Sequence, residues 1–145
     1  MMKLSTDISF RCPRFKPTPG ELDEAHDEYI NPGVFAKAAA DFIAHELARM
    51  DYKVSGIIQE DWGRWVELDN PDGYFLAVGI ANYDPDNHRD HDNDTHRLFV
   101  EPDKSPVRKW FRKIDTEARV MKLFSDIRQI LEKDSGISDI KVGEV

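Results

Sequence analysis

Apolar residues recur along this chain in two rhythms, one typical of helices and the other of strands. Between residues 34 and 50, and again between 107 and 131, they return every three or four positions. This spacing gathers apolar side chains on one face of a helix. We therefore predict two amphipathic helices. The segment 31–33 (Asn-Pro-Gly) would open the first, and Ser105 with Pro106, as N-cap and first helical residue, the second.

Shorter segments alternate between apolar and polar residues or are apolar throughout, which indicates strands. The Asn-Pro-Asp-Gly run at 70–73 is a strong turn signal, because proline presets one turn position and glycine accepts a positive φ. Four prolines and an acidic run make 11–33 a long loop, and 82–94 is a polar loop. Strands are expected at residues 3–10, 53–59, 62–69, 74–81, 96–101 and 137–142.

The order of these elements predicts an α+β fold. A two-layer sandwich follows, with two helices on one face of a mainly antiparallel sheet, in the order β-α-β-β-β-β-α-β. With 145 residues, 40% of them hydrophobic, the chain suits a single domain over 1–145. The strand phases place Trp65, Phe75 and Phe99 on the sheet face away from the helices. Such an aromatic patch would be a partner site, unless the long N-terminal loop covers it.

The charge balance narrows the choice of partner. Twenty lysines and arginines stand against 28 aspartates and glutamates, a net charge of −8. An acidic protein repels phosphate backbones and anionic lipid, so nucleic acid and membrane surfaces are not expected partners. The single cysteine, Cys12, fits a reducing compartment. The N-terminus does not resemble a signal peptide and no apolar run is long enough to span a membrane, so we expect a cytoplasmic protein.

A run rich in aspartate and histidine, residues 84–96, is the first candidate for chemistry. Its aspartates follow the spacing of the first ligands of a calcium loop, but Thr95 stands where the sharp turn needs glycine. Histidines with carboxylate support could instead hold a transition metal, and a solvated hairpin loop is the structural alternative. The candidate metal ligands are His88, Asp90, His91, Asp92, Asp94 and His96.

A basic segment at the predicted start of the second helix is the second candidate. Basic residues interleaved with Trp110 and Phe111, next to free helix amides, could bind an anion. The same aromatic residues follow helical spacing, so they could equally be core residues, with the basic side chains on the solvent-exposed face of the helix. The candidate anion-binding residues are Ser105, Arg108, Lys109, Arg112 and Lys113.

An acidic run in the long loop is the third candidate, as a docking site for a basic protein or as a plain solvated loop. Catalysis has less support. His45-Glu46 begins like a zinc-protease helix, but Arg49 replaces the second histidine, and no serine-hydrolase, P-loop or dinucleotide motif is present. We therefore predict no catalytic residue and no cofactor besides the metal considered above. The candidate partner-binding residues are Glu21, Asp23, Glu24, Asp27, Glu28 and Trp65.

Three segments carry a resemblance to other proteins. Residues 60–67 (Glu-Asp-Trp-Gly-Arg-Trp-Val-Glu), 101–102 (Glu-Pro) and 108–116 (Arg-Lys-Trp-Phe-Arg-Lys-Ile-Asp-Thr) resemble a group of small uncharacterised bacterial proteins with a D-W-G-W-like strand segment, here interrupted by Arg64. The resemblance covers about residues 33–142. It implies a bacterial source and a compact α+β domain, and no activity or cofactor.

These observations favour a non-enzymatic, acidic, protein-binding domain, with an immunity- or antitoxin-like role as the concrete form. Its carboxylates would meet a basic partner, and electrostatic attraction would speed the encounter. The alternative is a metal-binding protein or metal-dependent enzyme that uses residues 84–101.

Overall fold

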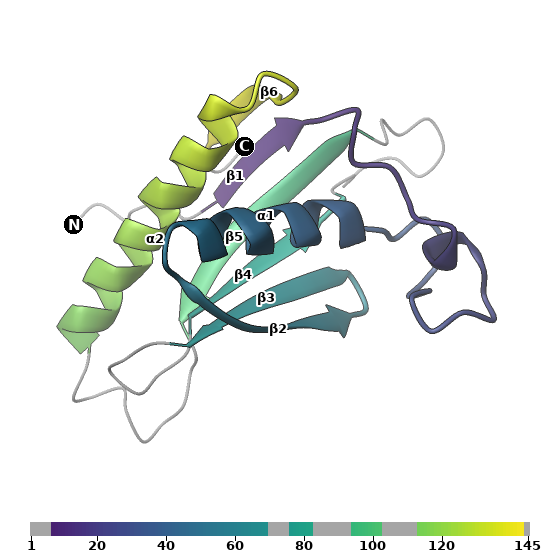
Figure 1. Cartoon of the computed structure of the whole chain (residues 1–145), viewed down its shortest axis with the longest axis horizontal. Coiled ribbons are helices and arrows are strands. Elements are labelled where there is room, and N and C mark those ends of the chain that lie inside the picture. The colour runs from purple at the N-terminus through teal and green to yellow at the C-terminus, as the bar shows by residue number, and fades with distance from the viewer. Residues whose placement is uncertain (1–6, 70–75, 83–93, 103–112, 144–145) are drawn as a thin grey trace.

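A computed structural model describes residues 7–69, 76–82, 94–102 and 113–143 (Figure 1). Its strands form one open antiparallel sheet in the order β2-β3-β4-β5-β1-β6, and both helices lie on one face of it. The predicted α+β class and order of elements are confirmed. The elements are β1 (Asp7–Arg11), the 3-10 turn η1 (Gly20–Leu22), α1 (Lys37–Arg49), β2 (Lys53–Glu60), β3 (Gly63–Asp69), β4 (Leu76–Ala81), β5 (Thr95–Pro102), α2 (Lys113–Lys133) and β6 (Ser138–Val142).

The core fills the space between the two helices and the sheet. Alternate residues of the central strands point to this side, and burial of each large apolar side chain contributes about 1.5–3 kcal/mol. The helices contribute Ala39, Ala40, Ile43, Leu47, Leu123, Ile127 and Leu131. The strands contribute Ile8, Phe10, Val66, Leu68, Val78, Ile80, Leu98 and Val100. Both helical stripes read from the sequence therefore face the sheet.

The first helix begins later than its apolar pattern predicts. Gly33 adopts a positive φ of 79°, and the Phe35 amide donates to the side chain of Asn82 at 2.9 Å. Helical hydrogen bonding starts only at Lys37, where a carboxylate from the preceding loop receives the first amides. The predicted opening at 31–33 is therefore wrong, because long-range contacts hold these residues outside the helix.

Some predicted features lie outside the described residues. They include Phe75, the turn at 70–73 and the helix start at Ser105 and Pro106. Within the described ranges, neither helix has the length and apolar character that a membrane crossing requires.

Candidate functional site

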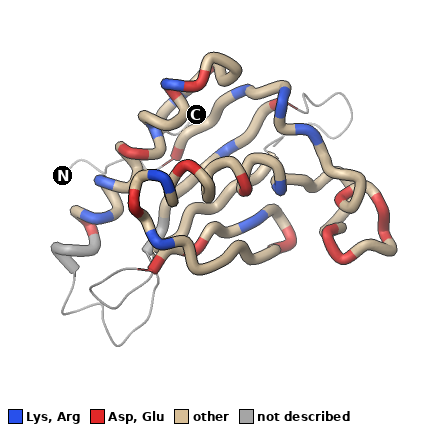
Figure 2. Tube along the Cα trace, in the orientation of Figure 1, with Lys and Arg blue, Asp and Glu red and all other residues tan. Residues whose placement is uncertain are grey.

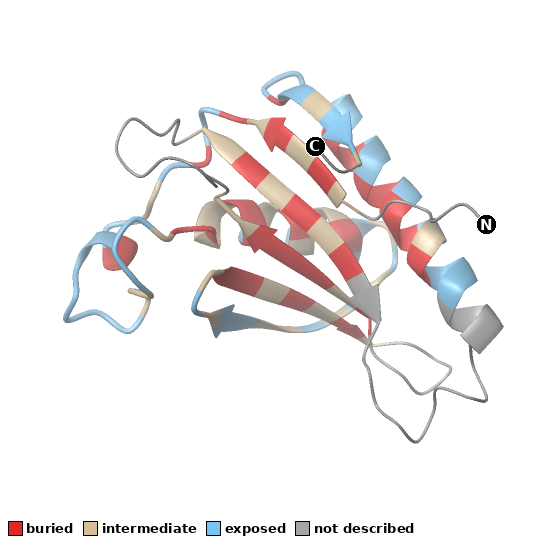
Figure 3. Ribbon diagram, turned by 180° about the vertical axis from the view of Figure 1, so that it is seen from behind, coloured by how far each residue is buried: buried red, intermediate tan, exposed pale blue. Residues whose placement is uncertain are grey.

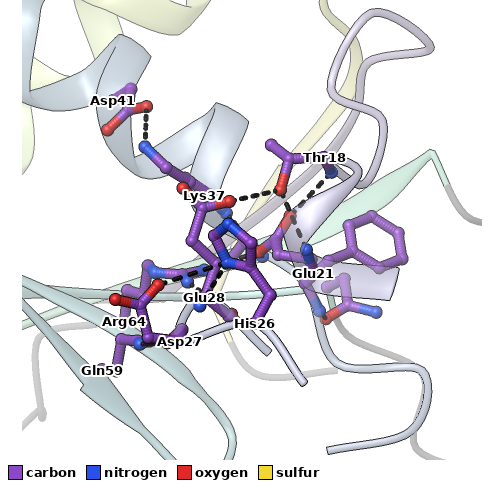
Figure 4. A network of polar contacts seen from close by, with 12 residues as sticks. Thr18, Glu21, His26, Asp27, Glu28, Lys37, Asp41, Gln59 and Arg64 are labelled. Carbon is purple, nitrogen blue, oxygen red and sulfur yellow. Dashed lines mark hydrogen bonds and ion pairs between the residues drawn. The ribbon is translucent and has the colours of Figure 1, made fainter. Parts of the chain in front are cut away.

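The N-terminal loop, residues 12–36, is tied to the sheet by a buried ion pair (Figure 4). Arg64 on β3 donates from Nη1 to Oε2 of Glu21 at 2.5 Å, and both side chains are withdrawn from water. Its other terminal nitrogen, Nη2, donates to the carbonyl of Glu28 at 3.1 Å. One guanidinium therefore holds two points of the loop.

The Glu21 carboxylate also completes the start of α1. Its Oε2 accepts the amides of Ala36 and Lys37, both at 3.0 Å, and its Oε1 accepts the amide of Thr18. Burial by itself would raise the pKa of Glu21, but the hydrogen bonds from these amides and from Arg64 outweigh burial and lower it. The prediction that Glu21 belongs to an exposed acidic surface is corrected, because only 3% of the residue is exposed.

Further hydrogen bonds fix the remainder of the N-terminal loop against the end of β2 and the turn between β2 and β3. Gln59 Nε2 donates to the Asp27 carbonyl at 2.9 Å, and Asn31 Nδ2 donates to the Asp61 carbonyl at 3.0 Å. Thr18 Oγ1 donates to the Glu28 carboxylate at 3.0 Å. The first two bonds bridge the loop and the hairpin and the third lies within the loop, so the loop is held in place beside the β2–β3 turn.

The exposed carboxylates of this loop are therefore presented from a fixed backbone. Asp23, Glu24 and Asp27 are exposed, while Glu28 is half-buried. No lysine or arginine occurs in the sequence between Lys16 and Lys37. Figure 2 shows these acidic residues along the loop that projects beside the hairpin. The loop thus forms a local concentration of negative charge, which we call the acidic loop (residues 21–28).

An aromatic cluster occupies the opposite face of the sheet from the helices. Trp62 and Trp65 meet edge to face with ring centroids 5.1 Å apart, and Phe99 lies 5.3 Å from each of them. All three residues are half-buried. The predicted placement of Trp65 and Phe99 on this face agrees with the register, whereas Trp62 was not singled out from the sequence. We call these three residues the aromatic cluster.

The strand register explains how the aromatic cluster assembles across three strands. Ile58, Trp65, Gly79, Phe99 and Asp7 are successive partners in one row across five strands. Gly79 stands at the centre of this row, where a Cβ would overlap the Phe99 ring. Because glycine has no side chain, the Phe99 ring can lie over the middle strand and reach the tryptophans.

The aromatic face is open in the described part of the molecule. Figure 3 shows this face with no described segment lying over it. Residues 12–36 of the N-terminal loop do not cover this face, so that alternative is wrong for these residues. The reason is that Glu21 is tied to Arg64, which pairs with the core residue Ile80 and is itself buried on the helix side.

Charged side chains border the aromatic cluster on the same face. Arg97 lies with its Cζ 5.8 Å from the Phe99 ring centroid and donates to Asp7 at 3.1 Å. The other border carries Glu60, Asp61 and Glu67, for which no ion pair is found among the described residues. The cluster therefore has a cation on one side only, as far as the described residues show.

The two described members of the predicted metal site point to different places. Asp94 accepts hydrogen bonds from Arg11 and Lys16, both at 3.0 Å. His96 lies in the core, opposite Phe10 in the register, because the strand phase turns its side chain toward the helices. The described residues hold no group of three or more metal-binding side chains. The pairing of Asp94 and His96 in one site is thus corrected, and His88, Asp90, His91 and Asp92 lie outside the described residues.

His96 itself sits in an aromatic box. Phe10 stacks on it with centroids 5.8 Å apart, and Phe15 and Phe35 meet its ring edge to face. It is fully buried, and neither ring nitrogen has a hydrogen-bond partner among the described residues. Burial lowers the pKa of His96 to about 4, against the opposing effect of Asp94 and Glu21. The imidazole is therefore neutral at physiological pH.

Neither the predicted anion-binding segment nor the single cysteine forms a functional site among the described residues. Ser105, Arg108, Lys109 and Arg112 lie outside the described residues, and Lys113 is the first residue of α2. Cys12 is free and fully buried, so its thiol is not accessible to a substrate in solution.

No protein-family model, curated protein or solved structure matches this chain significantly. The resemblance to small bacterial proteins stays a prediction. The acidic loop and the aromatic cluster are therefore the two candidate functional features among the described residues. The sequence pattern did not single out Trp62, which belongs to the aromatic cluster, or Arg64, which holds the acidic loop, although both fall inside the tryptophan-rich segment 60–67.

Proposed function

We propose that this protein is a non-enzymatic domain that binds a basic protein through one continuous surface. This aromatic–acidic surface consists of the aromatic cluster and the exposed carboxylates of the acidic loop. The observation that carries the proposal is their junction at the β2–β3 hairpin. Gln59 there donates to the Asp27 carbonyl of the acidic loop, and Asn31, three residues after that loop, donates to Asp61, which directly precedes Trp62. Tryptophan at the centre with a polar rim is typical of protein interfaces.

Charge favours a basic partner over the other possible occupants. A net charge of −8 makes two copies of the chain repel each other, and it repels nucleic acid as well. The sheet face is also a better docking site than the sheet edges. The β2–β3 pairing has an irregularity between Val54 and Gly56, and the β1–β6 pairing has one between Ser9 and Arg11. Such irregularities discourage addition of a strand from another chain.

The fixed backbone of the acidic loop suits a role in tight, fast binding. A loop that is already ordered by Arg64, Gln59 and Asn31 has less conformational freedom to lose on association. Concentrated negative charge accelerates encounter with a positively charged surface. An immunity- or antitoxin-like protein that neutralises a basic toxin in the cytoplasm would use both properties, and this is the role that we propose.

The first experiment identifies the partner from the position of contact. The photoreactive amino acid p-benzoylphenylalanine is placed at Ile58, which is 42% exposed beside the aromatic cluster, or at Ala48, which is exposed on α1. Irradiation in source cells followed by mass spectrometry should give a basic protein joined from Ile58 and absent from Ala48. The captured protein is then purified, and its Kd for the full chain is measured by calorimetry.

Charge-matched variants decide whether the acidic loop takes part. One variant carries Asp23→Asn, Glu24→Gln and Asp27→Asn. Its control carries Asp41→Asn, Glu117→Gln and Glu132→Gln on the helices and changes the net charge equally.

The loop variant should lose about tenfold in affinity for the purified partner, or about 1.4 kcal/mol, and the control should lose much less. Equal losses in the two variants, no loss in either, or a captured partner without excess positive charge would overturn the proposal.

A further inference from the structure

The aromatic cluster already holds one guanidinium from its own chain. Arg97 lies over the Phe99 ring with a Cζ-to-centroid distance of 5.8 Å, and its Nη2 donates to the Asp7 carboxylate at 3.1 Å. Register places Asp7 beside Phe99 in the same row, so carboxylate, guanidinium and ring come together on the open face. This arrangement combines a cation–π contact with an ion pair.

The chain uses the same arrangement a second time. Arg14 lies with its Cζ 5.1 Å from the Phe15 ring centroid and 5.4 Å from that of Phe42. Both of its terminal nitrogens donate to Asp134, at 2.7 and 3.2 Å. A guanidinium placed on an aromatic ring and bonded to a carboxylate therefore occurs twice among the described residues.

On the other side of the cluster, the two tryptophans provide the rings and two glutamates provide the carboxylates of such a unit, without the cation. Among the described residues, no lysine or arginine lies over Trp62 or Trp65. Glu67 follows Trp65 by two positions on β3, so both residues share the open face. Glu60 shares that face as well, because it follows Ile58 by two positions on β2 and Ile58 pairs with Trp65. Neither carboxylate has an ion-pair partner in the described ranges.

We infer that this side of the cluster binds an arginine side chain of the partner, stacked on Trp62 and Trp65 and paired with Glu67. This inference rests on the proposed function and specifies its chemistry. Arginine suits the position better than lysine, because its planar guanidinium can stack on an indole while it donates two parallel hydrogen bonds to a carboxylate. Tryptophan gives the strongest cation–π attraction of the aromatic residues.

Two peptides of equal charge test this preference. Hexa-arginine and hexa-lysine are titrated into the full chain at low salt, and their Kd values are measured by calorimetry. Each peptide is attracted equally by the net charge, so a difference between them reports on the guanidinium. Hexa-arginine should bind about fivefold tighter than hexa-lysine, as expected for a surface cation–π contact.

Variants locate the preference on the surface. Trp62→Leu should reduce the ratio of the two Kd values to near one, with folding verified by circular dichroism. Glu67→Gln, a conservative change of a half-buried side chain, should lower the ratio as well and remains informative if Trp62→Leu does not fold. Glu117→Gln, on the exposed face of α2, is the matched control and should leave the ratio unchanged.

The outcomes separate this inference from the proposed function. Equal binding of both peptides, or a preference that persists in Trp62→Leu and Glu67→Gln, overturns the arginine inference and leaves the basic-partner proposal standing. Binding of neither peptide also overturns it. A photo-cross-linked partner that is not basic removes the proposed function, whatever the peptides do.

Discussion

Glu21 in the N-terminal loop and Arg64 on β3, 43 positions apart in the sequence, form a buried ion pair at 2.5 Å. The pair links three parts of the molecule, because Glu21 also receives the first amides of α1 while Arg64 also binds the carbonyl of Glu28. The position of the acidic loop relative to the sheet therefore depends on it. Loss of this pair should affect stability and the presentation of the loop together.

Removal of the Arg64 guanidinium should lower the free energy of unfolding substantially. Arg64→Met leaves the buried Glu21 carboxylate without its ion-pair partner, so we expect a loss of about 3 kcal/mol in the free energy of unfolding, measured by urea titration. Arg128→Met removes an exposed ion pair with Glu132 and should cost less than about 1 kcal/mol. Similar losses in the two variants would contradict the structural role of Arg64.

The same pair should make the fold sensitive to acid. The pKa of Glu21 is lower in the folded chain than in the unfolded one, so its carboxylate contributes stability at pH values above its ordinary pKa. That contribution should disappear as the pH falls below about 4.5 and approaches the folded value. Glu21→Gln should therefore flatten the stability profile in this range. An unchanged slope below pH 4.5 would argue against the bonded carboxylate.

His96 should add a second acid-sensitive effect at higher pH. Its folded pKa of about 4 lies below the ordinary value of 6.5, so the unfolded chain binds the proton more tightly. Stability should fall by about 2 kcal/mol between pH 7 and pH 4.5 from this group alone. His96→Phe fills the aromatic box without a titrating group, so the drop should be smaller by that amount in urea titrations. An identical drop in both proteins would show that His96 does not titrate in this way.

Gly79 should be required for the aromatic cluster. Gly79→Ala places a Cβ against the Phe99 ring, which must move, so we expect a loss of about 1–3 kcal/mol and weaker partner binding. Gly56→Ala on β2 is the matched control, because a Cβ there meets nothing within 4 Å. Thermal unfolding and calorimetry with the purified partner report the two effects. The cluster would not depend on Gly79 if the two alanine variants behaved alike.

The order of the elements could be predicted because apolar periodicity reflects which faces are buried. The stripe that includes Ile43 and Leu47 packs on the sheet as its spacing indicates. The start of α1 could not be predicted, since the group that receives its first amides is Glu21, sixteen residues before Lys37. A local pattern carries no information on such a distant partner.

The candidate site was predictable only in part. The strand phase of Trp65 placed it correctly on the open face, but His96 was grouped with the polar loop before it although its phase turns it inward beside Phe10. Glu21 looks like its acidic neighbours in the sequence, and only its contact with Arg64 separates it from them. Residue type indicates which interactions a side chain can make. Burial, which depends on the tertiary structure, determines whether that side chain is accessible to a partner.

We propose that the acidic loop and the aromatic cluster bind the partner together, as one surface. The most direct test is a two-dimensional ¹H–¹⁵N NMR titration of the full chain with the purified cross-linked partner. We expect the amides of Asp23, Glu24 and Asp27 and the indole signals of Trp62 and Trp65 to change together at one stoichiometry. Changes confined to the helices, or to only one of the two parts of the surface, would contradict it.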